Sequence, residues 1–120
     1  MVKDINVGDD SYPEQIINVN GVAFFAAEDA VHGEELWKSD GTAAGTIFIK
    51  DISIVKADSD PDDFIEFSGE VFFVATDKAN GEELWKTDGT SAGTVLVKDI
   101  NPGTASSNIR YFTICNGILF

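Results

Sequence analysis

The sequence predicts an all-β fold built from a repeated unit of short antiparallel strands, and three observations carry this prediction. Residues 21–53 align without a gap on residues 69–101, with twenty of the 33 positions identical, and a fixed spacing of this size is typical of repeat architectures. Asn20-Gly21 and Asn116-Gly117 each separate two apolar runs. Tight hairpins are expected there, because both central residues of a type I′ turn need positive φ. The apolar runs have the length of strands.

Each repeat is expected to contain four strands joined in chain order. They are predicted at residues 15–19, 22–27, 35–38 and 46–52, and again at residues 63–67, 71–75, 83–86 and 94–100. Three short hairpin links and one longer, more variable link per repeat describe a four-stranded antiparallel meander. This arrangement is typical of a β-propeller blade whose first strand lies nearest the axis. A β-solenoid is the alternative, although its coils are usually shorter.

The chain is expected to form a single repeat domain over residues 1–120, with about two and a half blades. The predicted parts are the last strand of a preceding blade at 1–5, blade 1 at 15–52, blade 2 at 63–100, and the first two strands of a third blade at 109–120. Such a domain would leave apolar faces and strand edges uncovered. We therefore expect either neighbouring repeats of a longer chain or self-association. In the second case residues 2–5 of one chain complete the blade begun by residues 109–120 of another, in a dimer of about six blades.

The composition excludes several classes of partner. Eight basic residues against 21 acidic ones give a net charge of -13, which repels the phosphate backbone of nucleic acids. The sequence has no apolar run approaching the length of a membrane-spanning helix, so we expect no membrane span.

A few single residues carry expectations of their own. Cys115, the one cysteine, cannot form an intramolecular disulfide. It aligns with the apolar residues Val19 and Phe67 of the predicted first strands, so a buried thiol is expected. The Lys-Asp pairs at Lys3, Lys50 and Lys98 are expected at an exposed outer-strand edge, where charge discourages aggregation.

The strongest motif occurs twice, at Glu35–Thr42 and Glu83–Thr90, and reads Glu-Leu-Trp-Lys-Ser/Thr-Asp-Gly-Thr. It resembles the ELWxxDGT repeat family, which is named for this signature, and the resemblance covers nearly the whole chain. The resemblance implies a tandem repeat of large bacterial proteins, often exported or at the cell surface, whose arrays are thought to form propellers. That family has no established catalytic residues, so the resemblance transfers none.

Two sets of motif residues are expected to be structural. Trp37 and Trp85 fall at the same point of each repeat, which favours packing between blades over a sugar-stacking role. Asp40 and Asp88 are expected to cap the turn that follows each of them, in preference to binding a metal. The residues assigned to structure are Trp37, Asp40, Gly41, Thr42, Trp85, Asp88, Gly89 and Thr90.

The variable loops after the second and fourth strands supply the candidate binding residues, because repeat proteins place their variation on loops. These candidates are Asp9, Asp10, Tyr12, Glu28, Asp29, His32, Asp58, Asp60, Asp62 and Asp77. The acidic run Asp58–Asp63 could suit calcium, but Gly69 stands where an EF-hand loop needs its last glutamate. A looser calcium site stays open, and no other cofactor is expected. A zinc site is improbable, because His32 is the one histidine.

The expected function is therefore that of a non-catalytic module, either structural or binding proteins or glycans. A calcium-dependent adhesion module is one alternative. A fragment of a glycan-active enzyme is another, which would need acids converging from the first strands. The charged residues Glu66 and Arg110 on those strands do not supply such a pair.

Overall fold

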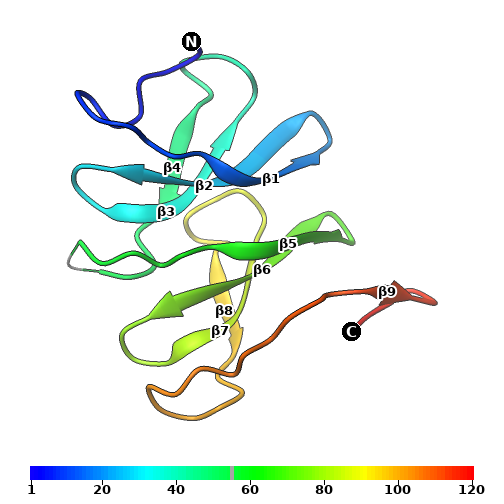
Figure 1. Cartoon of the computed structure of the whole chain (residues 1–120). Coiled ribbons are helices and arrows are strands. Elements are labelled where there is room, and N and C mark those ends of the chain that lie inside the picture. The colour runs from blue at the N-terminus through cyan, green and yellow to red at the C-terminus, as the bar shows by residue number, and fades with distance from the viewer. Residues whose placement is uncertain (55) are drawn as a thin grey trace.

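The structure is a computed structural model that describes residues 1–54 and 56–120 (Figure 1). Within these residues the regular structure is β-strand, as the sequence predicts. The first sheet contains β1 (Glu14–Val19), β2 (Val22–Asp29), β3 (Gly33–Ser39) and β4 (Ile47–Lys50). The second contains β5 (Asp62–Phe67), β6 (Glu70–Asp77), β7 (Gly81–Thr87) and β8 (Val95–Lys98). A short hairpin of β9 (Ile114–Cys115) and β10 (Ile118–Leu119) follows.

Both four-stranded sheets are antiparallel meanders with the same register. The strands pair in chain order, β1-β2-β3-β4 and β5-β6-β7-β8. Phe25 lies opposite Trp37 in the first sheet, as Phe73 lies opposite Trp85 in the second. The prediction of four-stranded antiparallel meanders is confirmed.

The turns between the first two strands of each sheet have the backbone that the sequence predicts. Asn20 and Gly21 have φ values of 52° and 84°, and Ser68 and Gly69 have values of 56° and 83°. A type I′ turn needs this left-handed conformation at both central residues, which Asn and Gly tolerate better than other residues.

The main core lies between the two sheets. It is formed by Phe24, Leu36, Ile49 and Ile52 on one side and by Val71, Phe73, Ala75 and Trp85 on the other. The first strands, β1 and β5, also lie beside each other (Figure 1). Each large apolar side chain buried in this way contributes about 1.5–3 kcal/mol of transfer free energy.

A smaller core lies on the opposite face of the first sheet. Phe25, Ala27 and Trp37 are buried there, and Ile5 packs against them. Ile5 belongs to residues 2–11, which we call the N-terminal strap. Although residues 1–5 are expected to be a strand, none is assigned to them, and among the described residues no strand pairs with them. Their place in a preceding blade stays a prediction.

Of two expectations about single residues, the one for Cys115 is wrong and the one for Lys50 is met only in part. Cys115 is exposed, because β9 pairs with β10 alone among the described strands and the neighbouring Ile114 is itself 46% exposed. Lys50 lies on the edge strand β4 and Lys98 on the edge strand β8, as expected, but Lys98 is exposed whereas Lys50 is only half-exposed. The Lys50 ammonium donates a 2.7 Å hydrogen bond to the Thr94 carbonyl of the second sheet, so its long side chain bridges the two repeats.

The packing between the sheets predicts a large effect for one core residue. Phe73→Ala should lower the free energy of unfolding by about 3–5 kcal/mol, because it leaves a cavity at a fully buried position between the sheets. Urea unfolding followed by tryptophan fluorescence measures this loss. The control, Ile16→Ala, removes a side chain that is 65% exposed and should change stability by less than about 0.5 kcal/mol. Equal losses in the two variants would contradict the assignment of the core.

Candidate functional site

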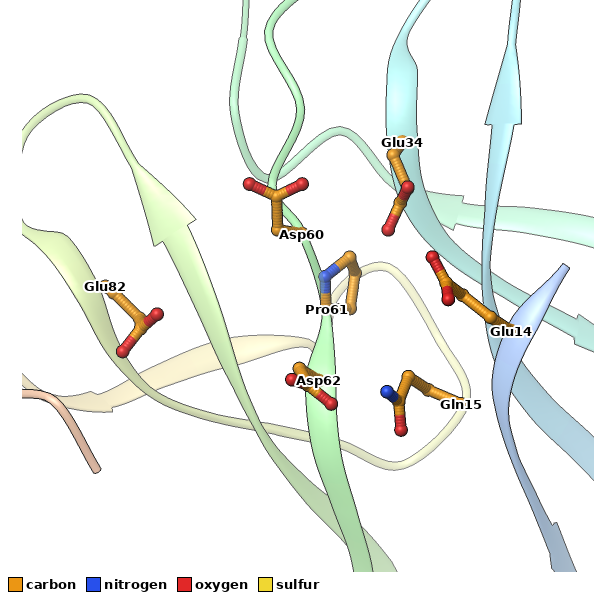
Figure 2. A pocket seen from close by; sticks show the side chains of 7 residues that line it. All are labelled: Glu14, Gln15, Glu34, Asp60, Pro61, Asp62 and Glu82. Carbon is orange, nitrogen blue, oxygen red and sulfur yellow. The ribbon is translucent and has the colours of Figure 1, made fainter. Parts of the chain in front are cut away.

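A hollow lined mainly by carboxylates lies at one end of the two sheets. Its volume is about 280 Å³, and it is lined by Glu14, Gln15, Glu34, Asp60, Pro61, Asp62 and Glu82 (Figure 2). Figure 2 shows Glu14 and Glu34 on one side of the strand that carries Pro61 and Asp62, and Glu82 on its other side. We call this site the acidic hollow.

The internal repeat explains why so many carboxylates meet here. Glu14 and Asp62 are the first residues of β1 and β5, and Glu34 and Glu82 are the second residues of β3 and β7. The same two positions of each repeat are thus brought to the same end of the structure. Each added repeat that places an acid at these positions adds negative charge to this end.

Electrostatic repulsion in the hollow is concentrated on Glu34. Partial burial and, after it, the negative charges of Asp60 and Glu14 together raise the pKa of Glu34 to about 7. Burial also raises the pKa of Asp60, followed by the charge of Asp58.

Glu82 differs from Glu34 because it has a basic partner. Its Oε1 lies 2.6 Å from Nη1 of Arg110. The hydrogen bond with Glu82 raises the pKa of the Arg110 guanidinium. The two equivalent glutamates therefore sit in opposite electrostatic surroundings, and the uncompensated charge lies on the side of the first sheet.

A pair of fully buried glutamates, Glu35 and Glu83, lies next to the hollow in the sequence but points into the protein. The Glu35 carboxylate accepts hydrogen bonds from Ile52 N at 3.0 Å, from Ser53 N at 3.1 Å and from Ser59 Oγ at 2.7 Å. Glu83 accepts equivalent backbone bonds at the end of the second repeat. Both side chains fix the connection that leaves the fourth strand.

Burial raises the pKa of Glu35 to about 7, and the hydrogen bond from Ser59 opposes this effect. The roles of Glu35 and Glu83 were not predicted from the sequence. The available signal was a glutamate repeated at the same strand position beside Leu and Trp, where a charged residue is unusual.

Three of the expected binding residues stabilise hairpins. Asp29 Oδ1 accepts hydrogen bonds from the backbone of Val31 and His32, each at 2.7 Å. Asp77 Oδ1 does the same for Ala79 and Asn80. The His32 ring also bonds Asp29, with its Nδ1 2.8 Å from Oδ2. These side chains shape the turns between the second and third strands.

The acidic residues just before and at the start of β5 have two different roles. Asp58 Oδ1 accepts a 2.8 Å hydrogen bond from Glu34 N, which ties the loop that precedes β5 to the start of β3. Asp60 and Asp62 line the acidic hollow. They are the two members of the expected binding set that the structure places there.

The remaining candidates do not line the hollow, although Glu28 lies opposite Glu34 in the pairing of β2 with β3, and its charge adds to the pKa shift of Glu34. Asp9 and Asp10 are exposed on the strap, with Asp10 N donating to Asp9 Oδ1 at 2.9 Å. Tyr12 is 60% exposed. Glu28 is half-buried in β2, where its backbone N–H donates to Ser11 O. The candidate binding residues therefore divide between the hollow, the turns between the second and third strands, and the strap.

The residues expected to be structural lie in the two cores or stabilise turns. Asp40 Oδ1 accepts hydrogen bonds from Thr42 Oγ1 at 2.7 Å and from Thr42 N at 2.9 Å. These bonds hold the pKa of the Asp40 carboxyl below its usual value, and Asp88 behaves in the same way with Thr90. A Cβ at Gly45 would overlap the Asp40 carboxylate, so this position needs glycine.

The arrangement of potential metal ligands and of helices adds two findings. Over residues 1–54 and 56–120, no three His, Cys, Asp or Glu side chains converge closely enough to hold a metal ion. The calcium site considered for the acidic loop stays a prediction. The described part of the chain also has no helix that is long and apolar enough to cross a membrane.

Comparison of this chain with protein-family models, with curated proteins and with solved structures found no match. The geometry of the sheets and of the acidic hollow therefore carries the functional argument.

Protonation of Glu34 should make stability depend on pH. Its folded-state pKa of about 7 lies above the ordinary value of 4.5. Proton binding by Glu34 therefore stabilises the folded state. This stabilisation is complete below pH 4.5 and is lost as the pH rises through 7. Glu34→Gln should flatten the fall in the free energy of unfolding between about pH 5 and pH 8.

Urea unfolding at four pH values across this range measures the slope for Glu34→Gln. Asp4→Asn removes the same charge from an exposed position on the strap and serves as the control. The same pH slope in Glu34→Gln and in the unsubstituted protein would show that Glu34 titrates normally.

Removal of the Glu35 carboxylate should destabilise the connection after β4. Glu35→Ala leaves the buried N–H groups of Ile52 and Ser53 without an acceptor and should cost about 2–4 kcal/mol. Glu35→Gln retains one oxygen and should cost less. Denaturant unfolding measures the loss in the free energy of unfolding for each variant and tests whether Glu35→Ala loses more than Glu35→Gln.

The control for Glu35 is Glu66→Ala, which removes a carboxylate that accepts the Gly69 N–H at the surface. Its cost should stay below about 1 kcal/mol. A cost for Glu66→Ala as large as that for Glu35→Ala would argue against a special role of the buried carboxylate.

Proposed function

We propose that this chain is a non-catalytic β-propeller repeat module that acts as a binding scaffold. Each four-stranded meander corresponds to one blade in this proposal, with residues 15–52 and 63–100 as the first two. The acidic hollow forms part of the binding surface. The observation that carries the proposal is that two sequence repeats pack face to face and bring equivalent residues to one end.

The arrangement of the sheets supports the propeller. The first strands β1 and β5 lie beside each other (Figure 1), as blades do around an axis. The chain passes from the last strand of one sheet, β4, to the first strand of the next, β5. The contact of Lys50 with Thr94 joins consecutive sheets.

The charge of the hollow supports a particular class of ligand. Glu14, Glu34, Asp60 and Asp62 line it without a basic residue among its lining side chains. Burial is the main cause of the raised pKa of Glu34, and a basic segment of a partner protein would relieve the repulsion by neighbouring carboxylates that adds to it. Anionic partners such as nucleic acids are disfavoured by the same charges.

A cationic peptide tests this proposal. Titration with a hexalysine peptide at low and physiological salt should show weak, salt-sensitive binding. The double variant Glu34→Gln and Asp60→Asn should weaken it about tenfold, because two carboxylates of the hollow are neutralised. Isothermal titration calorimetry measures the affinity.

The matched control is the double variant Asp4→Asn and Asp9→Asn, which removes the same charge from exposed strap positions and should bind as the unsubstituted protein does. Equal weakening in both double variants would assign the binding to net charge and would overturn the role of the hollow. A rise in melting temperature with calcium and not with magnesium would favour the calcium-dependent adhesion module instead.

A further inference from the structure

One apolar surface occurs twice in the chain, once covered and once open. The covered face of the first sheet consists of Phe24, Leu36, Ile49 and Ile52. The equivalent open face of the second sheet consists of Phe72, Leu84, Val97 and Ile100. Ile49 and Ile52 are each 6% exposed, whereas Val97 is 42% exposed and Ile100 is 50% exposed. The open face thus has the residues of a packing surface, but over residues 1–54 and 56–120 Val97 and Ile100 stay exposed, while Phe72 and Leu84 are half-buried.

The matching surface also occurs twice. Val71, Phe73, Ala75 and Trp85 of the second sheet pack on the covered face. Their equivalents in the first sheet are Ala23, Phe25, Ala27 and Trp37, which we call the strap face, because Ile5 of the N-terminal strap packs on it. The chain therefore carries both halves of its own internal interface on its two outer sides.

Polar contacts across the internal interface follow the same pattern. Lys38 Nζ donates to the Gly89 carbonyl at 2.6 Å, and Lys50 Nζ donates to the Thr94 carbonyl at 2.7 Å. The equivalents of Gly89 and Lys50 are Gly41 and Lys98, which are both exposed, whereas Lys86, the equivalent of Lys38, pairs with Glu70 at 3.0 Å.

The strap makes the same hydrogen bonds to the first sheet that the end of the first repeat makes to the second sheet. Its Lys3 donates to the Thr46 carbonyl at 2.7 Å, as Lys50 donates to that of Thr94. Its Ser11 carbonyl accepts Glu28 N at 2.9 Å, as the Ser59 carbonyl accepts Thr76 N at 2.8 Å. The strap (dark blue in Figure 1) lies against the face of the first sheet that is turned away from the second sheet.

We propose that the strap face binds the open face of a second copy of this chain, whose residues around Val97–Ile100 take the place of the strap. The reason is the continuity with the internal interface, in which the same pair of surfaces is already packed. The open face offers four apolar side chains, whereas the strap offers Ile5 alone among its described contacts with this core. Burial of more apolar surface favours the exchange.

The resulting contact is head-to-tail, because the two surfaces differ and lie on opposite sides of the chain. It rests on the packing of repeats that the proposed function also uses. It does not depend on binding at the acidic hollow, so the hexalysine titration can fail while this contact stands.

Sedimentation velocity of the full chain over a range of concentrations tests the proposal. The unsubstituted protein should gain mass as its concentration rises. Val97→Asp places a charge in the proposed contact and should weaken association at least about 100-fold. The double variant Lys3→Ala and Ile5→Ser loosens the strap and should strengthen association.

Val95→Asp is the matched control on the same strand. Val95 is 37% exposed, and its equivalent Ile47 stays 40% exposed although the second sheet packs on the first. A charge at residue 95 should therefore leave association unchanged. Circular dichroism of every variant checks the fold.

Two results would overturn the proposal. One is a monomer at all concentrations for both the unsubstituted protein and the strap variant. The other is association of folded Val97→Asp that equals that of Val95→Asp. A monomeric unsubstituted protein with an associating strap variant would show that the two faces fit each other but would contradict the displacement of the strap by a second copy.

Discussion

Apolar contact between successive sheets is the constraint on which the rest of this structure depends. Each four-stranded meander has two consecutive Phe residues in its second strand, and these point to opposite faces of the sheet. Both faces are therefore apolar, and they can be buried only against neighbouring parts of the structure. Phe73 and Trp85 fill the space left by Phe24, Leu36 and Ile49. This packing fixes the sheets relative to each other and so brings the start of β5 beside that of β1. The acidic hollow exists because of that proximity.

The buried glutamates complete this packing with polar contacts. A carboxylate inside a protein is costly unless its oxygens are hydrogen-bonded. Glu35 meets this condition with two backbone N–H groups and the Ser59 hydroxyl. The apolar faces supply most of the favourable free energy, and the carboxylate determines the path by which the chain reaches the next sheet.

The local features of the fold were predictable from the sequence because their signals lie within a few residues. Asn20-Gly21 predicts its hairpin through backbone preference alone, and the Asp40-Gly41-Thr42 run predicts its capped turn. The burial expected for Cys115 and the free exposure expected for Lys50 were not found, because each depends on contacts with a distant part of the chain. The sequence alone does not say whether a sheet covers Cys115 or whether a carbonyl lies within reach of Lys50.

The candidate site was predictable only in part for the same reason. Asp60 and Asp62 belong to a conspicuous acidic run, so the sequence identified them. Glu14, Glu34 and Glu82 are scattered along the chain, and their meeting depends on how one repeat packs on the next. Glu34 also stands beside Glu35, and the sequence does not show which of the two points outward. Strand alternation separates them only once the buried face is known.

The hydrogen bonds of Glu35 have a consequence for how such repeats can diversify. Its two main-chain donors, Ile52 N and Ser53 N, are present whatever side chains stand at those positions. Residues 53–62 and 101–110 share only Ala and Ser at two aligned positions, yet Ser59 and Ser107 both reach the third strand of their own sheet with the same backbone bond. A linker held by backbone hydrogen bonds can change its side chains while its backbone path is kept. It can therefore acquire new binding specificities while the sheets stay fixed.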